Sequence, residues 1–271
     1  MQPLQLRGKW VLVTGASAGL GTELARHLAK DHGANLILAA RRRDRLEALA
    51  AELTADYGVS VECAPTDLSR PDDVGRLYEA AVTARPVYAA VLNAGVTWFG
   101  HGIEQSWADA EALLRTNVDA VVQLALRFTN HFREQGGGAV MMVTSLTAFA
   151  PFPYQALYGA TKSLVTHYGV ALSEELKGTG VSVTVFAPGG IATEMLDHMG
   201  GAFKKGDLGI MNADVCARYA VRGMVARRPL VVPGALNRVN ALVMQLSPRA
   251  VVMRSVSNLY RKALLAKKPA G

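Results

Sequence analysis

Tyr158 and Lys162 are the two residues whose chemistry and spacing best suit proton transfer. They lie four positions apart, so on a helix both side chains project from one face and the ammonium lies near the phenol. A free tyrosine has a pKa of about 10, and bringing it to neutrality takes about 4 kcal/mol. One unit charge at about 4 Å supplies about that energy at an effective dielectric constant of about 20. Alone, such a pair is common and usually exposed, so its meaning depends on the fold around it.

A glycine-rich segment, 14–21, follows the first apolar run of the chain and reads T-G-A-S-A-G-L-G. Gly15 permits a sharp turn, Gly19 lets backbone approach a pyrophosphate, and Gly21 lets the next helix pack closely on the strand. Leu20, between the last two glycines, is expected to line the same site. The spacing G-x-x-x-G-x-G therefore indicates a dinucleotide site.

The same segment contains G-x-S-x-G centred on Ser17, which also matches the nucleophile elbow of α/β-hydrolases. An elbow requires earlier strands and a loop with oxyanion-hole donors, and only 14 residues precede Gly15. A serine hydrolase acting through Ser17 is therefore a remote alternative, and we expect Ser17 to contact the nucleotide instead.

Short, β-rich apolar runs alternate with longer segments of helical period. Six such alternations predict an α/β fold with a doubly wound parallel sheet, Rossmann-like, in three layers and a single domain. A ligand would bind at the carboxyl ends of the strands, where the strand order reverses. The predicted strands are Trp10 to Thr14, Asn35 to Ala40, Ser60 to Ala64, Val87 to Leu92, Ala139 to Thr144 and Val181 to Ala187. The helices include Leu20 to Asp31, Asp44 to Tyr57 and Pro71 to Ala84, with Gly33, Gly58 and Gly178 as candidate C-caps.

The single domain, 1–271, divides into three parts. The core covers 9–193, and residues 194–212 break the alternation and are predicted to form a substrate flap. Residues 234–271 form a basic helical extension. Beyond the flap, the predicted elements are a helix over Ala213 to Ala226, a strand over Leu230 to Val232, and helices over Ala235 to Leu246 and Arg249 to Ala266 on either side of Pro248.

Composition excludes several classes of protein. Half of the 271 residues are hydrophobic and 19% are charged, which excludes intrinsic disorder. Two cysteines cannot form a disulfide framework, and the six histidines show no metal-binding spacing, so no metal is expected. We recognise no signal peptide or membrane-spanning run and expect a cytoplasmic protein.

The net charge of +7 is unevenly distributed. Residues 215–271 hold 11 Lys or Arg and no Asp or Glu, whereas the first 214 residues carry 18 basic and 22 acidic side chains. A stretch of one sign favours either a solvated helical face or a surface that meets anions. The anionic partners that fit are a membrane surface, with the protein bound peripherally, an acidic carrier protein and a coenzyme A phosphate. Nucleic acid is not expected, because this stretch lacks a recognised binding motif and the remainder is acidic.

Further polar residues stand near the ends of the predicted strands. They are Asn93-Ala94-Gly95, Ser145, Pro188-Gly189-Gly190 and Thr193, and Asn117 lies in a predicted helix. Together with the glycine segment and Tyr158-Gly-Ala-Thr-Lys162, they follow the order of motifs in the short-chain dehydrogenase/reductase family. The chain resembles that family over roughly Lys9 to Thr193, and the resemblance does not cover the basic extension.

The resemblance implies an oxidoreductase with four catalytic residues: Asn117, Ser145, Tyr158 and Lys162. Tyr158 would protonate a carbonyl oxygen as hydride reaches the carbon, and Ser145 would donate a hydrogen bond to the same oxygen. Lys162 would hold the nicotinamide ribose and lower the pKa of Tyr158. Asn117 would anchor a water molecule that restores the proton.

The residues after the second predicted strand indicate which dinucleotide binds. No carboxylate stands there to hold a ribose 2′-hydroxyl, and Arg41 and Arg42 can bind a 2′-phosphate through paired hydrogen bonds. We therefore predict NADP(H), with Arg41 as the first contact and Arg42 as the second. Alternatively, the arginines merely begin an exposed helix. The resemblance adds the other cofactor contacts: Asp67, Leu68, Asn93, Ala94, Gly95, Tyr158, Lys162, Pro188, Gly189, Ile191 and Thr193.

The expected activity is that of an NADPH-dependent carbonyl reductase or secondary-alcohol dehydrogenase acting on a hydrophobic acyl-chain, steroid-like or aryl compound. By family analogy, the pocket wall comes from Thr97 to His101, Leu146 to Gln155 and the flap. Its apolar members are Trp98, Phe99, Phe149, Phe152, Tyr154, Met195, Met199 and Phe203. A non-catalytic NADP(H)-binding sensor or interaction protein is the alternative.

Two expectations concern assembly. Members of the family commonly pair through the helices that carry Asn117 and Tyr158, which predicts a homodimer or homotetramer. In the last predicted helix, Val252, Val256, Leu259 and Ala263 form one apolar stripe, away from Arg254 and Arg261. This stripe fits packing on the body of the protein and also fits a membrane contact.

Overall fold

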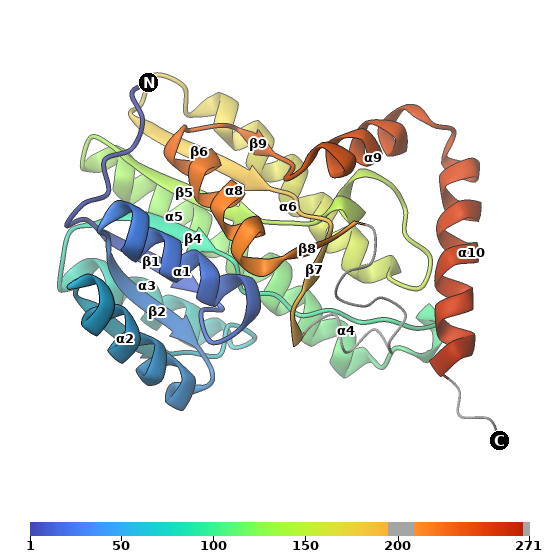
Figure 1. Cartoon of the computed structure of the whole chain (residues 1–271), viewed down its shortest axis with the longest axis horizontal. Coiled ribbons are helices and arrows are strands. Elements are labelled where there is room, and N and C mark those ends of the chain that lie inside the picture. Colours follow the sequence, from blue (N-terminus) through green and yellow to red (C-terminus); the bar gives the residue numbers. More distant parts are fainter. Residues whose placement is uncertain (195–208, 268–271) are drawn as a thin grey trace.

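The computed structural model describes residues 1–194 and 209–267. Its centre is a seven-stranded sheet in the order β3-β2-β1-β4-β5-β6-β9, in which neighbouring strands are parallel (Figure 1). The predicted doubly wound, Rossmann-like fold is confirmed. The strands are β1 (Trp10–Thr14), β2 (Asn35–Ala40), β3 (Val61–Pro65), β4 (Val87–Leu92), β5 (Gly138–Val143), β6 (Val181–Phe186) and β9 (Leu230–Val231).

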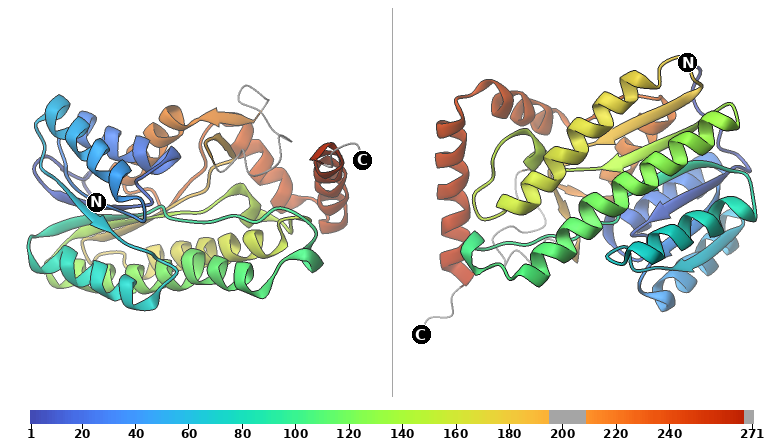
Figure 2. Two further views of the ribbon diagram at one scale, coloured as in Figure 1. Left: turned by 90° about the horizontal axis from the view of Figure 1, so that it is seen from below. Right: turned by 180° about the vertical axis from the view of Figure 1, so that it is seen from behind.

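Helices cover both faces of the sheet and so form the outer two of three layers (Figure 2). α1 (Gly19–His32), α2 (Arg43–Tyr57) and α8 (Ala213–Val225) bury their apolar side chains against one face. α3 (Pro71–Thr83), α5 (Ala120–Glu134) and α6 (Ala156–Glu175) lie on the other. Because both faces are covered, every residue of β5 and β6 is buried, which explains their unbroken apolar runs.

Turn chemistry fixes several helix ends. Gly33 and Gly58 adopt the left-handed conformation that closes α1 and α2, with φ of 61° and 66°, as predicted. Gly178 is not a C-cap, because α6 ends at Glu175 and Leu176 takes that position. Gly178 instead occupies the turn that follows, with φ of 83°.

Five short elements near the carboxyl ends of the strands differ from the predictions. β7 (Gly190–Ala192) pairs in parallel with β8 (Ile210–Asn212), so the two borders of the predicted flap form a small separate sheet. A π-helical turn, η2 (Arg115–Asp119), joins α4 (Trp107–Leu114) to α5. The 3₁₀ turns η1 (Gly102–Glu104) and η3 (Leu146–Phe149) follow β4 and β5. Residues 195–208 of the predicted flap lie outside the described residues.

The basic extension consists of two helices, α9 (Ala235–Leu246) and α10 (Arg249–Lys267), divided at Pro248 as predicted. α10 stands at one side of the molecule, beyond α4 (Figure 1). The predicted apolar stripe is only partly correct. Val252 is buried, but Leu259 is exposed and Tyr260 takes the buried position, while the side chain of Ala263 lies outside the described ones. In the part of the chain that is described, no helix is long and apolar enough to cross a membrane.

Candidate active site

The site begins where β1 and β4, far apart in sequence, lie side by side at the point where the strand order reverses. The Thr14 hydroxyl accepts hydrogen bonds from the backbone N–H groups of Asn93 and Ala94, at 3.0 and 3.1 Å. Gly15 has φ of 69°, and a Cβ there would approach the Ala94 Cα to 2.8 Å. Glycine is therefore required on both conformational and steric grounds, and the loops after β1 and β4 are locked together.

The glycine-rich segment places the start of α1 at this edge. Gly19 has φ of 56°, and a Cβ there would approach Thr193 to 2.9 Å, so the predicted phosphate loop and Thr193 face each other. A Cβ on Gly21 would collide with the Gly15 carbonyl oxygen. Ala18, the N-cap of α1, has no side-chain acceptor for the first helical N–H groups. A helix N-terminus of this kind is suited to binding phosphate.

Two arginines flank the segment on the β2 side. Arg42 donates from Nε to the Ser17 hydroxyl at 3.3 Å and forms an ion pair with Glu194 at 3.1 Å. Arg45 also pairs with Glu194, at 2.6 Å. Arg41 is exposed, and its positive charge helps to lower the pKa of Asp67. Arg42 is the N-cap of α2 and also contacts the glycine loop, so it does more than begin an exposed helix.

Asp67 lies after β3. Its carboxylate accepts hydrogen bonds from the backbone N–H and the hydroxyl of Ser69, at 3.0 and 2.8 Å. Burial opposes ionisation of Asp67, but these bonds and the charges of Arg41 and Arg70 outweigh it, and its pKa lies below the ordinary value. Asp67 is not the N-cap of the next helix, because Arg70 holds that position in α3.

The Ser17 hydroxyl contacts a guanidinium, which has no acceptor for a proton and cannot serve as a general base. The geometry of this serine therefore gives no support to a hydrolase.

Tyr158 lies in the first turn of α6, and Ser145 follows β5. The Ser145 side chain lies close enough to the Tyr158 hydroxyl to lower the pKa of that phenol. Ser145 is also the N-cap of η3 and accepts a hydrogen bond from the Thr147 N–H at 3.2 Å. Burial raises the pKa of Tyr158 above its ordinary value, and Ser145 opposes this rise only in part. The phenol is therefore held in its protonated form.

Lys162 lies one turn further along α6 and is 5% exposed. Its Nζ donates to the Val143 carbonyl at 3.1 Å and lies 5.7 Å from the centre of the Tyr158 ring. Burial lowers the pKa of Lys162 to about 8. The sequence predicted that this lysine lowers the pKa of Tyr158. Lys162 is not among the causes of the shift, and burial of the phenol, the largest cause, raises that pKa.

Asn117 is fully buried in the π-helical turn η2. Its amide pairs with the backbone of Val96 through two hydrogen bonds of 2.9 Å and donates to the Thr161 hydroxyl at 3.3 Å. A Cβ on Gly95 would lie 3.2 Å from the Asn117 Oδ1 and 3.3 Å from the Lys162 Nζ. The segment after β4 therefore comes within contact distance of two of the four residues that the family pattern makes catalytic.

The loop after β6 completes the edge. Pro188 is buried, and its carbonyl accepts a hydrogen bond from the Leu146 N–H at 2.8 Å, which ties this loop to the segment after Ser145. A Cβ on Gly189 would approach the Asn237 Oδ1 of α9 to 2.7 Å, so the first extension helix rests on the turn. Ile191 lies in β7, directly before Thr193.

An aromatic cluster lines one side of this edge, and α10 supplies a member that the sequence patterns did not reveal. Tyr260 is 8% exposed, its ring centre lies 5.3 Å from that of Phe99 and 6.1 Å from that of Phe152, and it contacts Gln155. Phe99, Phe152 and Gln155 belong to the predicted pocket wall, and Tyr260 does not. The available signal was its spacing, four and eight positions beyond Val256 and Val252.

Of the other six apolar residues of the predicted wall, three belong to the described part of the chain and three do not. Tyr154 has φ of 67°, unusual for a non-glycine residue, and its ring packs on His101 with centres 5.1 Å apart. Trp98 lies against Gly100, and Phe149 ends η3. Met195, Met199 and Phe203 lie outside the described residues.

This geometry defines a class of protein: a Rossmann-like fold in which a glycine loop, a serine, a tyrosine and a buried lysine meet at the carboxyl ends of the strands. A family model described as short chain dehydrogenase matches residues 9–201. The chain belongs to the short-chain dehydrogenase family of oxidoreductases.

Individual relatives are distant. The chain is 26% identical over 204 residues to 17-beta-hydroxysteroid dehydrogenase type 3 of Mus musculus, covering 74% of this chain and 66% of that protein. Among solved structures, a 7beta-hydroxysteroid dehydrogenase superposes with a TM-score of 0.84 at 25% identity, covering 95% of this chain and all of the other. A short-chain dehydrogenase from Sphingobium yanoikuyae, in complex with NADPH, has a TM-score of 0.78 at 29% identity, with 97% of each chain covered.

Proposed function

We propose that this protein is an NADPH-dependent carbonyl reductase that converts a hydrophobic ketone to a secondary alcohol and can run in reverse. The observation that carries the proposal is the Tyr158 phenol, which interacts with the Ser145 side chain and is followed one helical turn later by the buried Lys162. A protonated phenol beside a second hydroxyl can accommodate and protonate a carbonyl oxygen.

Bound NADPH supplies the hydride that adds to the carbonyl carbon. In this direction Tyr158 gives its proton to the carbonyl oxygen as the carbon–oxygen double bond becomes single, and Ser145 stabilises the charge on that oxygen through its hydrogen bond. The raised pKa of Tyr158 keeps the proton available at neutral pH. Lys162 would hold the nicotinamide ribose. Asn117, fixed by the Val96 backbone, positions the segment after β4 and would anchor the water that returns the proton.

The choice of NADPH rests on the charge at the end of β2. Arg41 and Arg42 lie where the ribose of the adenosine half would fall, and Arg42 is held against Ser17 of the glycine loop. Guanidinium groups bind a phosphate through paired, charge-assisted hydrogen bonds. Because Arg42 donates a hydrogen bond to Ser17 of the loop, we rank it ahead of Arg41, which reverses the order expected from sequence.

The remaining cofactor contacts follow the same edge. The N-terminus of α1, with Gly15, Gly19, Leu20 and Gly21, would take the pyrophosphate, and Asp67 with Leu68 would contact the adenine. The segments Asn93 to Gly95 and Pro188 to Thr193 would hold the nicotinamide half.

We infer the substrate class from the aromatic cluster of Phe99, Phe152 and Tyr260, of which Tyr260 interacts with Tyr158. Two of the comparison proteins are named hydroxysteroid dehydrogenases, which act on large ring systems by their names. A bulky cyclic ketone therefore fits this site better than a small polar one.

A screen of NADPH oxidation over ketones of graded size tests the proposal. Tyr158→Phe should abolish reduction and leave NADPH affinity within a few-fold, because only the hydroxyl is removed. If the wild-type chain binds NADPH tightly and oxidises it with no ketone in the series, the protein is a nucleotide sensor and the reductase proposal fails.

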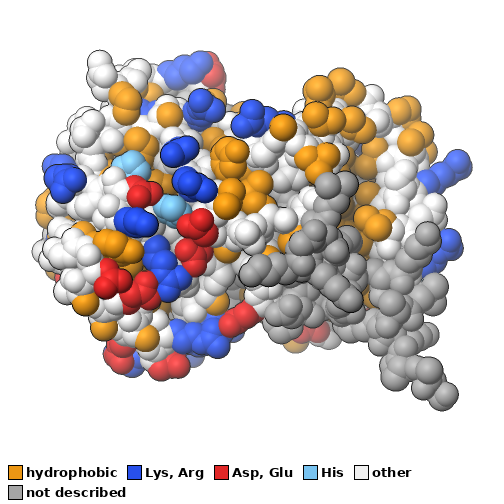
Figure 3. Space-filling view, in the orientation of Figure 1, with side chains coloured by type: hydrophobic (Ala, Val, Ile, Leu, Met, Phe, Trp, Pro, Cys, Tyr) orange, Lys and Arg blue, Asp and Glu red, His pale blue; other side chains and the backbone are white. Residues whose placement is uncertain are grey.

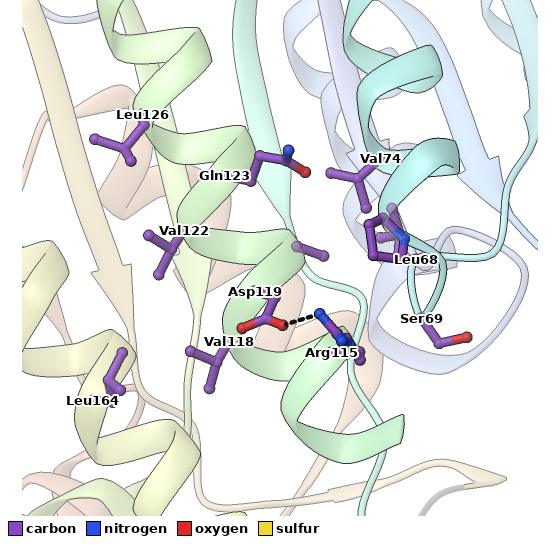
Figure 4. Close-up of a pocket in the computed structure, with 12 residues that line it drawn as sticks. Leu68, Ser69, Val74, Arg115, Val118, Asp119, Val122, Gln123, Leu126 and Leu164 are labelled. Atoms are coloured by element: carbon purple, nitrogen blue, oxygen red, sulfur yellow. Dashed lines mark hydrogen bonds and ion pairs between the residues drawn. The ribbon is translucent and has the colours of Figure 1, made fainter. Parts of the chain in front are cut away.

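We also propose a homodimer or homotetramer that forms through α5 and α6. A cavity of about 590 Å³ is lined by residues of the segment after β3, α3, η2, α5 and α6. Val118, Val122, Leu126 and Leu164 lie on its α5 and α6 side, beside the Arg115–Asp119 ion pair (Figure 4). Its lining includes none of the four proposed catalytic residues. Leu164→Asp should shift the mass measured by light scattering toward the monomer, whereas Ile103→Asp, at a residue 97% exposed on η1, should not.

The extension offers a second contact surface, which we propose binds an anionic membrane. α9 buries the polar Asn237, and both extension helices expose apolar side chains. These are Leu236, Val239, Leu242, Val243 and Leu246 of α9 and Val251, Met253 and Leu259 of α10. Figure 3 shows the apolar side chains over α9 and α10, with basic groups at the outer edge. No acidic residue follows Asp214, so the surface complements negatively charged lipid.

Cosedimentation with vesicles of phosphatidylcholine, with and without phosphatidylserine, tests the membrane contact. Binding should require phosphatidylserine and should weaken in Leu246→Asp, where the side chain is 76% exposed, but not in Ile103→Asp. Absence of binding together with a change of oligomeric state in Leu246→Asp would assign the surface to a second copy of the chain.

A further inference from the structure

Glu194 connects two sides of the edge that forms the proposed nucleotide site. It directly follows Thr193, and a Cβ on Gly19 would approach the Thr193 side chain to 2.9 Å, so the chain passes close to the glycine-rich segment at this point. The Glu194 carboxylate then reaches the start of α2, where it accepts hydrogen bonds from Arg42 and Arg45. This contact joins the chain after β7 to the residues after β2.

The ion pairs of Glu194 have the geometry of an anion site built from two arginines. Its Oε2 lies 3.1 Å from the Arg42 Nη1 and its Oε1 lies 2.6 Å from the Arg45 Nη1, so each oxygen has a guanidinium of its own. Hydrogen bonds from Arg45 and Arg42 lower the pKa of Glu194, which keeps its carboxylate ionised near neutral pH. Arg42 also donates to the Ser17 hydroxyl at 3.3 Å and to the Ser17 carbonyl at 3.4 Å, which holds this site against the glycine loop.

Arg42 is also the first arginine proposed to bind the 2′-phosphate of NADPH, so the phosphate and the Glu194 carboxylate compete for it. A phosphate monoester carries a charge of about −1.5 to −2 at pH 7 and presents three oxygens, whereas the carboxylate carries a single charge and presents two. Both anions on one pair of arginines would repel each other at short range. The phosphate is the stronger ligand and displaces the carboxylate, but the two ion pairs must then break.

We propose that Glu194 is a specificity-determining residue, an internal carboxylate that occupies the 2′-phosphate site formed by Arg42 and Arg45 and so lowers the preference of the chain for NADPH over NADH. This inference rests on the proposed binding of NADPH. NADH has a 2′-hydroxyl in place of the phosphate and leaves the ion pairs intact, so the competition acts on NADPH alone. Arg45, in the first turn of α2, becomes a phosphate ligand together with Arg42.

Two other roles for Glu194 predict different behaviour. If the carboxylate orients the two guanidinium groups for the phosphate, its removal should weaken the binding of NADPH. If the contact is only an exposed ion pair of the common kind, its removal should change the binding of neither nucleotide. Competition alone predicts that the phosphorylated nucleotide binds more tightly once the carboxylate is gone.

Calorimetric titration of the full chain with adenosine 2′,5′-bisphosphate and with adenosine 5′-phosphate measures the contribution of the 2′-phosphate without turnover. Glu194→Gln keeps the side-chain shape and removes the charge. At a salt concentration of about 0.15 M, it should tighten binding of the bisphosphate about 3-fold, within the range of an exposed ion pair, and leave the monophosphate unchanged. Glu47→Gln is the matched control, because this carboxylate is 57% exposed against 53% for Glu194 and pairs with Arg43 of the same helix. It should change neither affinity.

A second variant tests the two-arginine site itself. Adding Arg45→Ala to Glu194→Gln should cancel the gain, because the phosphate then loses one of its two guanidinium groups. A gain that survives this change would overturn the two-arginine site.

Three further results would overturn the inference alone: weaker binding of the bisphosphate to Glu194→Gln, binding equal to that of the wild-type chain, or an equal gain in Glu47→Gln, which would reflect net charge only. A wild-type chain that binds the bisphosphate no more tightly than the monophosphate would reject the proposed 2′-phosphate contact, and the inference with it. Titrations with NADPH and NADH should repeat the pattern of the two adenosine nucleotides.

Discussion

Replacing Lys162 with methionine is expected to stabilise the folded chain near neutral pH while abolishing reduction. The lysine is 5% exposed, and burial lowers its pKa from 10.5 to about 8. At about 1.4 kcal/mol for each pKa unit, that difference costs the native state about 3 kcal/mol at pH 7. Methionine has a similar length and no charge. It loses the hydrogen bond to Val143, which contributes about 1 kcal/mol, so the net gain is about 2 kcal/mol.

The pH dependence isolates the ionisation from other effects of the substitution. Because the folded-state pKa of Lys162 is lowered, the unfolded chain binds more protons between about pH 8 and 10.5, and the wild-type protein gains stability as the pH rises through that window. Below pH 8 the full penalty applies. The advantage of Lys162→Met should therefore shrink by about 2 kcal/mol between pH 7 and pH 9.5, where little of it should remain.

Urea denaturation of the nucleotide-free chain at several pH values measures these free energies of unfolding. Lys177→Met is the matched control, because this lysine lies just beyond α6 with its side chain 67% exposed, and its substitution should leave no such pH-dependent difference. A stability difference between wild type and Lys162→Met that stays constant from pH 7 to 9.5 would refute the reasoning, since it would mean that Lys162 is not desolvated.

Other substitutions test the edge that holds the nucleotide and the core beneath it. Arg42→Ala should raise the KM for NADPH several-fold more than that for NADH in initial-rate assays, whereas Arg43→Ala, at an exposed arginine paired with Glu47, should raise neither; equal effects on both nucleotides would reject the 2′-phosphate assignment. Gly15→Ala and Gly58→Ala both place an alanine in the left-handed region, at a cost of about 1 kcal/mol, but only Gly15 is crowded by Ala94. Denaturation should therefore show the larger loss of unfolding free energy for Gly15→Ala, and calorimetry should show that only this variant loses NADPH binding. Phe128→Ala should lower the free energy of unfolding by about 3–5 kcal/mol, because this ring is completely buried between α5 and the sheet; a loss under 1 kcal/mol would contradict the packing.

The sheet could be predicted closely because its strands are buried on both faces and flanked by turn residues. β1, β2 and β4 begin and end where the apolar runs do. β6 ends one residue earlier than predicted, and β3 and β5 are each shifted by one residue at both ends. The small β7 and β8 pair escaped prediction because three-residue strands carry no measurable period. The π-helical turn at Asn117 has no local signature either, since its spacing depends on the contact of Asn117 with Val96.

At the site, the order of motifs predicted a set of residues but not their energetics. Tyr158 and Lys162 fall on one helical face, as their spacing requires, yet a pairwise charge argument failed to include burial, which dominates the pKa of both groups. Arg42 proved to be the arginine in contact with Ser17, a matter of backbone direction at the end of β2. Tyr260 was missed because its partner Gln155 lies 105 positions away in the sequence.

The origin of the aromatic cluster has a consequence for how new activities arise in such a chain. Every group proposed to move the proton or hold the nucleotide is encoded before residue 194, whereas Tyr260 of the proposed substrate wall arrives with the last helix. During synthesis, the proposed catalytic and nucleotide-binding residues are therefore translated before Tyr260. Exchanging the final segment between related genes could change which molecule is accepted while the proton-transfer residues stay untouched.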